Sequence, residues 1–151
     1  MELRLDIRNE SRHRIVVRRD VLQRLGERIC QGEGIAGEAE LSVLYCSDAT
    51  IRDLNRDYRH KDEATDVLSF EQEGPGAMRV LGDVVISLDT VARRCNNDTN
   101  AMRGEVRLLF CHGLLHLLGY DHHTRRERER MAAKQAEYLN LPVDAAWPVE
   151  A

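Results

Sequence analysis

The stretch MRGEVRLLFCHGLLHLLGYDH, residues 102–122, decides the fold of this chain. Apolar residues occupy most sides of its helical pattern from about Met102 to Leu118, which is typical of a helix at the centre of a domain. His112 and His116 are four residues apart and therefore project from one face of that helix, about a turn from each other. We expect a buried central helix that carries two neighbouring imidazoles.

A third histidine follows this helix. Gly119 comes three residues after His116, where a residue with positive φ can end the helix and reverse the chain. His122 would then face the same point as the first two imidazoles. Three nitrogen ligands leave the fourth position of a tetrahedral zinc open, as in catalytic zinc sites. The spacing predicts one zinc ion per chain, held by His112, His116 and His122.

The rest of the chain alternates between strand and helix patterns. Period-two alternation and short apolar runs predict strands over residues 3–7, 41–46, 67–70 and 80–87. Apolar spacings of three and four, with capping residues, predict further helices over residues 17–29, about 48–58, 88–95 and 124–139. The last two strands flank the glycine- and proline-containing segment 71–78 and are expected to form a hairpin. The arginine-rich final helix is expected to be largely solvent-exposed.

Composition is that of a globular protein, with 42% hydrophobic and 32% charged residues. Apolar runs fall far short of the ~20 residues of a membrane span, and the first ten residues contain no signal-peptide core. Residues 1–151 are therefore expected to form a single α+β domain in the cytoplasm, a small mixed β-sheet covered by helices, with no membrane partner. The four cysteines lack the short spacing of a thiolate metal motif.

The histidine spacing equals that of the long zinc motif of metallopeptidases, in which a general-base glutamate follows the first histidine. This chain has Gly113 at that position. Loss of a general base lowers a rate by roughly 10²- to 10⁴-fold, so the motif favours a hydrolytic reaction other than peptide cleavage. Glu105 and Asp121 are the nearest carboxylates by sequence. Glu105 either approaches the site or is an exposed surface residue, and Asp121 either orients an imidazole or shapes a turn.

Residues 112–122 match the pattern H-G-x-L-H-L-x-G-Y-D-H throughout, and on these residues the chain resembles the YbeY family of bacterial metal-dependent endoribonucleases. Two further blocks are similar to the family. One contains Leu54-Asn55, Tyr58-Arg59, Lys61-Asp62 and residues 65–70, and the other covers residues 81–87. The chain departs from the pattern at Glu71, where a proline often follows the phenylalanine, and in its short C-terminal tail.

The resemblance implies a zincin-like fold with zinc on the three histidines. It further implies cleavage of single-stranded RNA in the maturation of 16S ribosomal RNA and in ribosome quality control. Small ribosomal subunit proteins and a ribosome-assembly GTPase are the implied partners. Arg59 corresponds to the family's arginine in the Tyr-Arg pair, with a role in RNA binding or catalysis. A guanidinium suits a phosphate because its planar fork donates two hydrogen bonds and stays charged.

Two other functions stay open at the level of sequence. The first is a metallohydrolase of another substrate, such as a peptide, which the ligand spacing alone supports. The second is a ribosome-assembly factor whose metal is mainly structural. The net charge of −4 favours this second alternative, whereas the arginines within residues 12–19 and 125–130 offer local positive charge for RNA.

Overall fold

The computed structural model describes residues 1–72 and 79–149. Within these ranges the strands are β1 (Glu2–Asn9), β2 (Glu38–Cys46), β3 (Val67–Glu71) and β4 (Arg79–Ser87). The helices are α1 (Arg19–Gly32), α2 (Asp48–Arg59), α3 (Leu88–Arg94), α4 (Thr99–Leu117), α5 (Arg125–Leu139) and the short 3-10 helix η1 (Val143–Ala145). The predicted α+β class and the predicted order of elements are confirmed.

The strands form one mixed sheet in the order β1-β2-β4-β3. β1 and β4 each run parallel to β2, and the connection from β1 to β2 passes through α1, because parallel neighbours need a crossover. β3 pairs antiparallel with β4, with Ser69 opposite Val84, so the predicted hairpin is confirmed. Most of its predicted connection, residues 73–78, lies outside the described residues. Because β3 is last in the strand order, it is an edge strand of the sheet.

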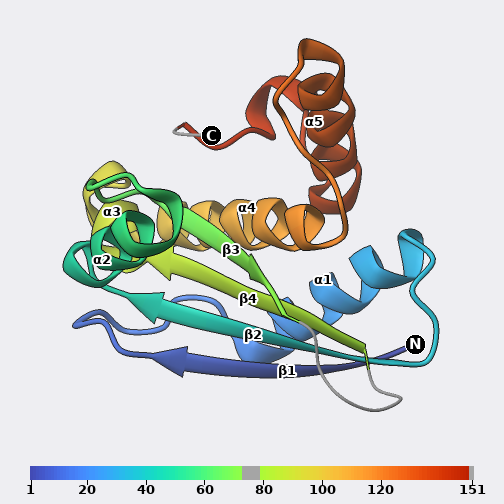
Figure 1. The fold of residues 1–151 in the computed structure, drawn as a ribbon, viewed down its shortest axis with the longest axis horizontal. Helices are drawn as coiled ribbons and strands as arrows, with labels where there is room; N and C mark the ends of the chain where they lie inside the picture. The colour runs from blue at the N-terminus through green and yellow to red at the C-terminus, as the bar shows by residue number, and fades with distance from the viewer. Residues whose placement is uncertain (73–78, 150–151) are drawn as a thin grey trace.

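The two faces of the sheet are covered by different helices. Alternate residues of a strand point to opposite faces, so neighbouring residues contact different helices. Val43 and Val84 face the main core, together with the buried sides of α1 and α4. Leu44 and Val85 face a smaller cluster under α2. α4 crosses over the sheet, and α5 packs on α4 at a distance from the strands (Figure 1). The central position predicted for the histidine-bearing helix is confirmed.

Three helices differ in detail from the sequence prediction. α4 begins at Thr99, three residues before the expected start, because the side chain of Asp98 caps it by accepting from the Ala101 N–H at 2.9 Å. α1 begins at Arg19 instead of residue 17. The expectation that the last helix is largely solvent-exposed is wrong for one face of α5, whose buried residues are Met131, Ala132, Gln135, Ala136, Tyr138 and Leu139. Among the described residues, none of the helices has both the length and the apolar character needed to cross a bilayer.

Candidate metal centre

His112 and His116 project from one face of α4, as their spacing predicted. His112 is buried, with 4% of its surface exposed, and His116 is half-buried. Their Nε2 atoms lie 3.1 Å apart, and the two rings are nearly perpendicular, at 82°. Two ring nitrogens therefore face one point at the end of the helix.

The third histidine reaches the same point through the turn that Gly119 makes. Gly119 has a φ of 106°, a region that side chains rarely adopt, and its N–H donates to the carbonyl of His116 at 3.0 Å. The chain reverses there, which brings the ring of His122 to within 5.0 Å of the ring of His116, centre to centre. One ring nitrogen from each of the three histidines lies within 4.8 Å of the others.

Hydrogen bonds on the outer side of the first two rings decide which nitrogen carries the proton. The carbonyl of Tyr120 can only accept, so Nδ1 of His116 donates to it at 2.9 Å. The amide of Gln135 donates to the carbonyl of Ala146, which turns its Oε1 toward Nδ1 of His112 at 2.8 Å. His112 therefore also carries its proton on Nδ1. In the neutral rings both Nε2 atoms are unprotonated, and their lone pairs face each other.

These two rings are neutral near pH 7. Burial, followed by repulsion from the charged form of His116, lowers the pKa of His112 to about 3. Burial, followed by repulsion from His122, lowers the pKa of His116 as well. No proton then fills the space between the two facing lone pairs, which repel each other unless a cation shares them. Imidazole nitrogens are preferred ligands of zinc, so this set of donors fits a zinc ion.

The side of the site away from the sheet is closed by α5 and the C-terminal tail. Trp147, the only tryptophan of the chain, contacts both His112 and His122 edge to face, with ring centres 5.3 Å apart in each pair. The guanidinium of Arg128 lies 5.1 Å from the centre of the indole. Neither Gln135 nor Trp147 was predicted from the sequence, because no local pattern connects them to the histidines.

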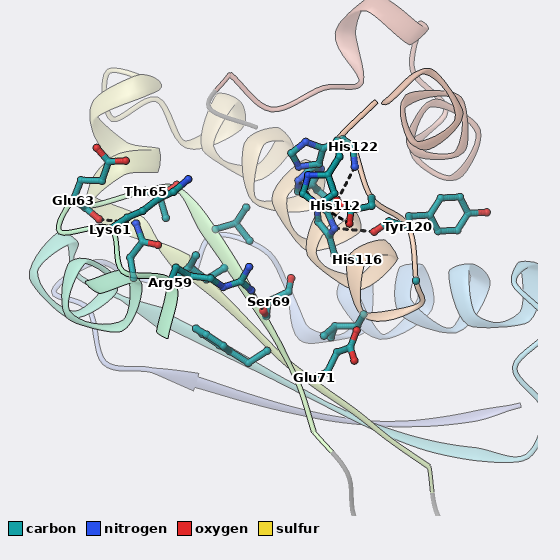
Figure 2. Close-up of a pocket in the computed structure, with 18 of the residues that line it drawn as sticks. Arg59, Lys61, Glu63, Thr65, Ser69, Glu71, His112, His116, Tyr120 and His122 are labelled. Atoms are coloured by element: carbon teal, nitrogen blue, oxygen red, sulfur yellow. Dashed lines mark hydrogen bonds and ion pairs between the residues drawn. The ribbon is translucent and has the colours of Figure 1, made fainter. Parts of the chain in front are cut away.

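All four predicted site residues line one cleft of about 1120 Å³. Figure 2 shows the three imidazoles grouped at one side of this cleft, with Arg59 facing them from the end of α2. Arg59 is exposed but anchored, because its Nη2 donates to the carbonyl of Ser69 at 2.6 Å and its guanidinium lies 5.7 Å from the centre of the Phe70 ring. A charged fork is thus held beside the three nitrogen ligands.

The carboxylates near the histidines in sequence have other roles. Glu105 does not reach the cleft and is not an exposed residue either, because its side chain is 15% exposed and accepts from Arg94 at 2.7 Å. Asp121 lines the cleft, where its Oδ1 accepts from the backbone N–H of His122 at 2.8 Å and shapes the turn. Its Oδ2 lies 2.9 Å from Nε2 of His123, which is exposed. Glu63 and Glu71 also line the cleft, although no sequence pattern predicted them there.

The packing of α4 on the sheet explains why a glycine follows the first histidine. A Cβ atom at Gly113 would lie 2.7 Å from Cγ1 of Val84 and 3.1 Å from Oγ of Ser69. The carbonyl of Gly113 also accepts from this Ser69 hydroxyl at 2.9 Å. Any side chain at position 113 would therefore begin against β3 and β4, so the glutamate of the peptidase motif has no room here.

Three histidine nitrogens that converge beside an open cleft define a class of protein, the mixed α+β proteins with a candidate metal-binding site. The family model "Endoribonuclease YbeY" matches residues 6–141. This chain belongs to that family.

Relatives named "Endoribonuclease YbeY" agree with this match. The one from Anaeromyxobacter dehalogenans is 54% identical over 101 residues, which are 66% of this chain and 52% of the relative, so the match spans about half of that relative's length. The one from Lysinibacillus sphaericus is 37% identical over 92% of this chain and 95% of the relative. The solution structure of TM1509 from Thermotoga maritima has a TM-score of 0.54 at 28% identity, covering 95% of this chain and 89% of that chain.

Proposed function

We propose that this chain is a zinc-dependent endoribonuclease specific for single-stranded RNA. It acts in the maturation of 16S ribosomal RNA and in ribosome quality control in the cytoplasm, with residues 1–151 working as one domain. The convergence of His112, His116 and His122 at an open cleft carries this proposal, together with the membership of the endoribonuclease family. Single-stranded RNA, small ribosomal subunit proteins and a ribosome-assembly GTPase are the proposed partners.

The three imidazoles hold one zinc ion through the nitrogens that face one another. Zinc in such a site polarises a phosphoryl oxygen and lowers the pKa of water toward ~7. Gln135 and the carbonyl of Tyr120 keep the outer nitrogens of His112 and His116 protonated, so that the inner nitrogens are free to bind the ion. Trp147 excludes water from the side of the site opposite the cleft.

Arg59 binds the scissile phosphate. Its bond to the Ser69 carbonyl uses Nη2, and the guanidinium has further N–H donors that can reach an anion in the cleft. The positive charge of Arg59 is close enough to contribute to the lowered pKa of His116, after burial and the larger effect of His122. Arg59 and the three histidines line the same cleft, which suits a residue that holds a phosphate beside the metal.

The edge of the sheet favours RNA over a peptide as substrate. Extended peptides bind many proteins by adding a strand to a sheet edge. Here β3 is that edge. Just before β3, the carbonyl of Asp66 accepts a hydrogen bond from the N–H of Ser87 in β4. Hydrogen-bonded and non-hydrogen-bonded pairs alternate along an antiparallel ladder, so the backbone N–H and C=O of Ser69, opposite Val84, point away from β4. Arg59 already occupies the Ser69 carbonyl. A peptide would have to displace the same guanidinium that suits a phosphate.

The proposal is tested by incubating the purified protein with single-stranded RNA, with double-stranded RNA and with a peptide library. Each incubation is repeated after chelation and again after zinc is restored. We expect cleavage of single-stranded RNA that chelation abolishes and zinc restores. Chelator-sensitive peptide cleavage would instead support a peptidase. Zinc binding without any cleavage would support an assembly factor with a structural metal.

A further inference from the structure

Tyr120 lies between the second and third histidines, and both of its ends are held. Its carbonyl accepts from Nδ1 of His116 at 2.9 Å. Its hydroxyl donates to the carboxylate of Glu33 at 2.7 Å, at the end of α1 and 87 residues away in sequence. Figure 2 shows its ring pointing away from the cleft. Tyr120 thus connects a histidine of the site to a carboxylate on a distant helix.

Glu33 is built to hold this hydroxyl. Its side chain is 12% exposed, and its other oxygen accepts from the Tyr138 hydroxyl at 2.5 Å. Burial by itself would raise the pKa of Glu33, but the hydrogen bonds from Tyr138 and Tyr120 and the charge of Lys134 lower it. The carboxylate is therefore charged at neutral pH. Hydrogen bonds to a charged acceptor are roughly twice as strong as neutral ones.

The segment 118–122 needs an anchor of this kind. It follows the end of α4, and its bonds from Gly119 and Tyr120 return to the carbonyls of His116 and Leu115 on that same helix. The Tyr120 hydroxyl instead ties the segment to Glu33 at the end of α1, a helix whose buried residues belong to the main core. This bond sets the path of the chain from His116 to His122, and with it the direction of the carbonyl that orients the His116 ring.

We propose that Glu33, acting through Tyr120, is a positioning residue of the metal centre. The proposal rests on the zinc site proposed above and deepens it. Groups that hold the outer side of a metal ligand typically change metal affinity by about 10- to 100-fold when removed. Glu33 holds the residue that holds the ligand, so we expect an effect near the lower end of this range.

Tyr138 provides a matched control. Its hydroxyl donates to the same carboxylate of Glu33, but it lies on α5 and its contact leads away from the segment 118–122. Tyr138→Phe removes a hydrogen bond of the same type to the same acceptor. A purely structural role of Glu33 would affect both tyrosine variants alike, whereas a positioning role affects Tyr120→Phe selectively.

The test measures zinc affinity, by competition with a chromophoric chelator, for the full-length parent, Tyr120→Phe, Glu33→Ala, their double variant and Tyr138→Phe. Unfolding by urea without metal reports the stability of each. We expect about 10-fold weaker zinc binding for Tyr120→Phe and for Glu33→Ala. The double variant should show a similar loss, because each single change already breaks the hydrogen bond between Tyr120 and Glu33. Tyr138→Phe should bind zinc like the parent, and excess zinc should restore RNA cleavage by Tyr120→Phe.

Several results would overturn the inference. These are parental zinc affinity in Tyr120→Phe, equal weakening in Tyr138→Phe, or losses that add in the double variant. If the parent binds zinc and cleaves RNA while Tyr120→Phe binds zinc equally well, this inference fails alone. A parent that binds no metal would contradict both this inference and the zinc site on which it rests.

Discussion

Two clusters of titratable side chains lie along α4, two helical turns apart, and they differ in how they are completed. At Glu105, the guanidinium of Arg94 lies 2.7 Å from one carboxylate and 3.2 Å from that of Asp66, which is 2% exposed. Opposite charges satisfy one another there. At the histidines, two neutral rings direct lone pairs at each other across 3.1 Å. The first cluster is completed by the protein itself and joins α3 to α4, whereas the second presents nitrogen donors that can hold a metal ion.

Of the changes that test this contrast between the two clusters, removal of one histidine should have the largest effect. His116→Ala leaves only two of the three histidine ligands, so zinc content should fall from near one per chain to near zero. We expect zinc affinity to fall by more than the ~100-fold that removal of a hydrogen-bond partner of a ligand can cause. Elemental analysis after dialysis measures it. His123→Ala is the control, because His123 is exposed and pairs with Asp121. Equal zinc in parent and His116→Ala would refute the assigned ligands.

Breaking the first cluster should affect stability and leave the metal in place. Arg94→Leu leaves the buried carboxylate of Asp66 without this cation, and loss of one partner of a buried ion pair costs about 3–5 kcal/mol. Urea unfolding of the metal-free protein measures this loss. Arg93→Leu is a matched control, because Arg93 is exposed and its pair with Asp48 should contribute at most ~1 kcal/mol. Similar losses in the two variants, or zinc loss in Arg94→Leu, would contradict the distinction between the clusters.

The phosphate role of Arg59 is tested by Arg59→Ala. Loss of a charge-assisted contact costs about 1.5–3 kcal/mol, so cleavage of single-stranded RNA should slow by roughly 10- to 150-fold. Zinc content and unfolding should stay parental, because Arg59 is exposed and touches no histidine nitrogen. Arg59→Lys should restore only part of the rate, since an ammonium keeps the charge but not the fork. A parental rate in Arg59→Ala would show that the assigned role is wrong.

The metal-free protein should lose stability in mild acid because of the histidine cluster. The unfolded chain takes up a proton at His112 below a pKa of ~6.5, but the folded protein does so only below about 3. Stability therefore falls as pH decreases from 6.5, by roughly 1–2 kcal/mol at pH 5. Urea unfolding with chelator at several pH values measures the slope, which His112→Gln should reduce. A slope unaffected by this substitution would mean that His112 is not protected from protonation.

The sequence predicted the parts of the molecule that depend on local spacing. The triad was predictable because eleven residues, from one helix and the turn at Gly119 that follows it, contain all three ligands. The capping box at the start of α5 was predictable for the same reason, since Thr124 and Glu127 bond each other across a single turn. Such features need no knowledge of how distant elements pack.

The features that sequence could not predict depend on tertiary packing. Gln135 reaches His112 across 23 residues, and its polar side chain sits within an arginine-rich helix whose spacing hid the buried face. Glu105 shares a helix stripe with His112, yet Arg94 from α3 decides that it becomes part of an ion pair instead of the site. The strand order likewise depends on crossovers that hydrophobic patterns do not encode.

The central claim is that three imidazoles bind zinc and leave one position open to the cleft. X-ray absorption at the zinc edge of the loaded protein tests this most directly, because it reports the type, number and distance of the ligands. We predict three imidazole nitrogens and one further oxygen at about 2.0–2.1 Å, without sulfur. Four imidazoles would describe a closed structural site. A thiolate at about 2.3 Å would place the metal at a cysteine, and either result would contradict the account.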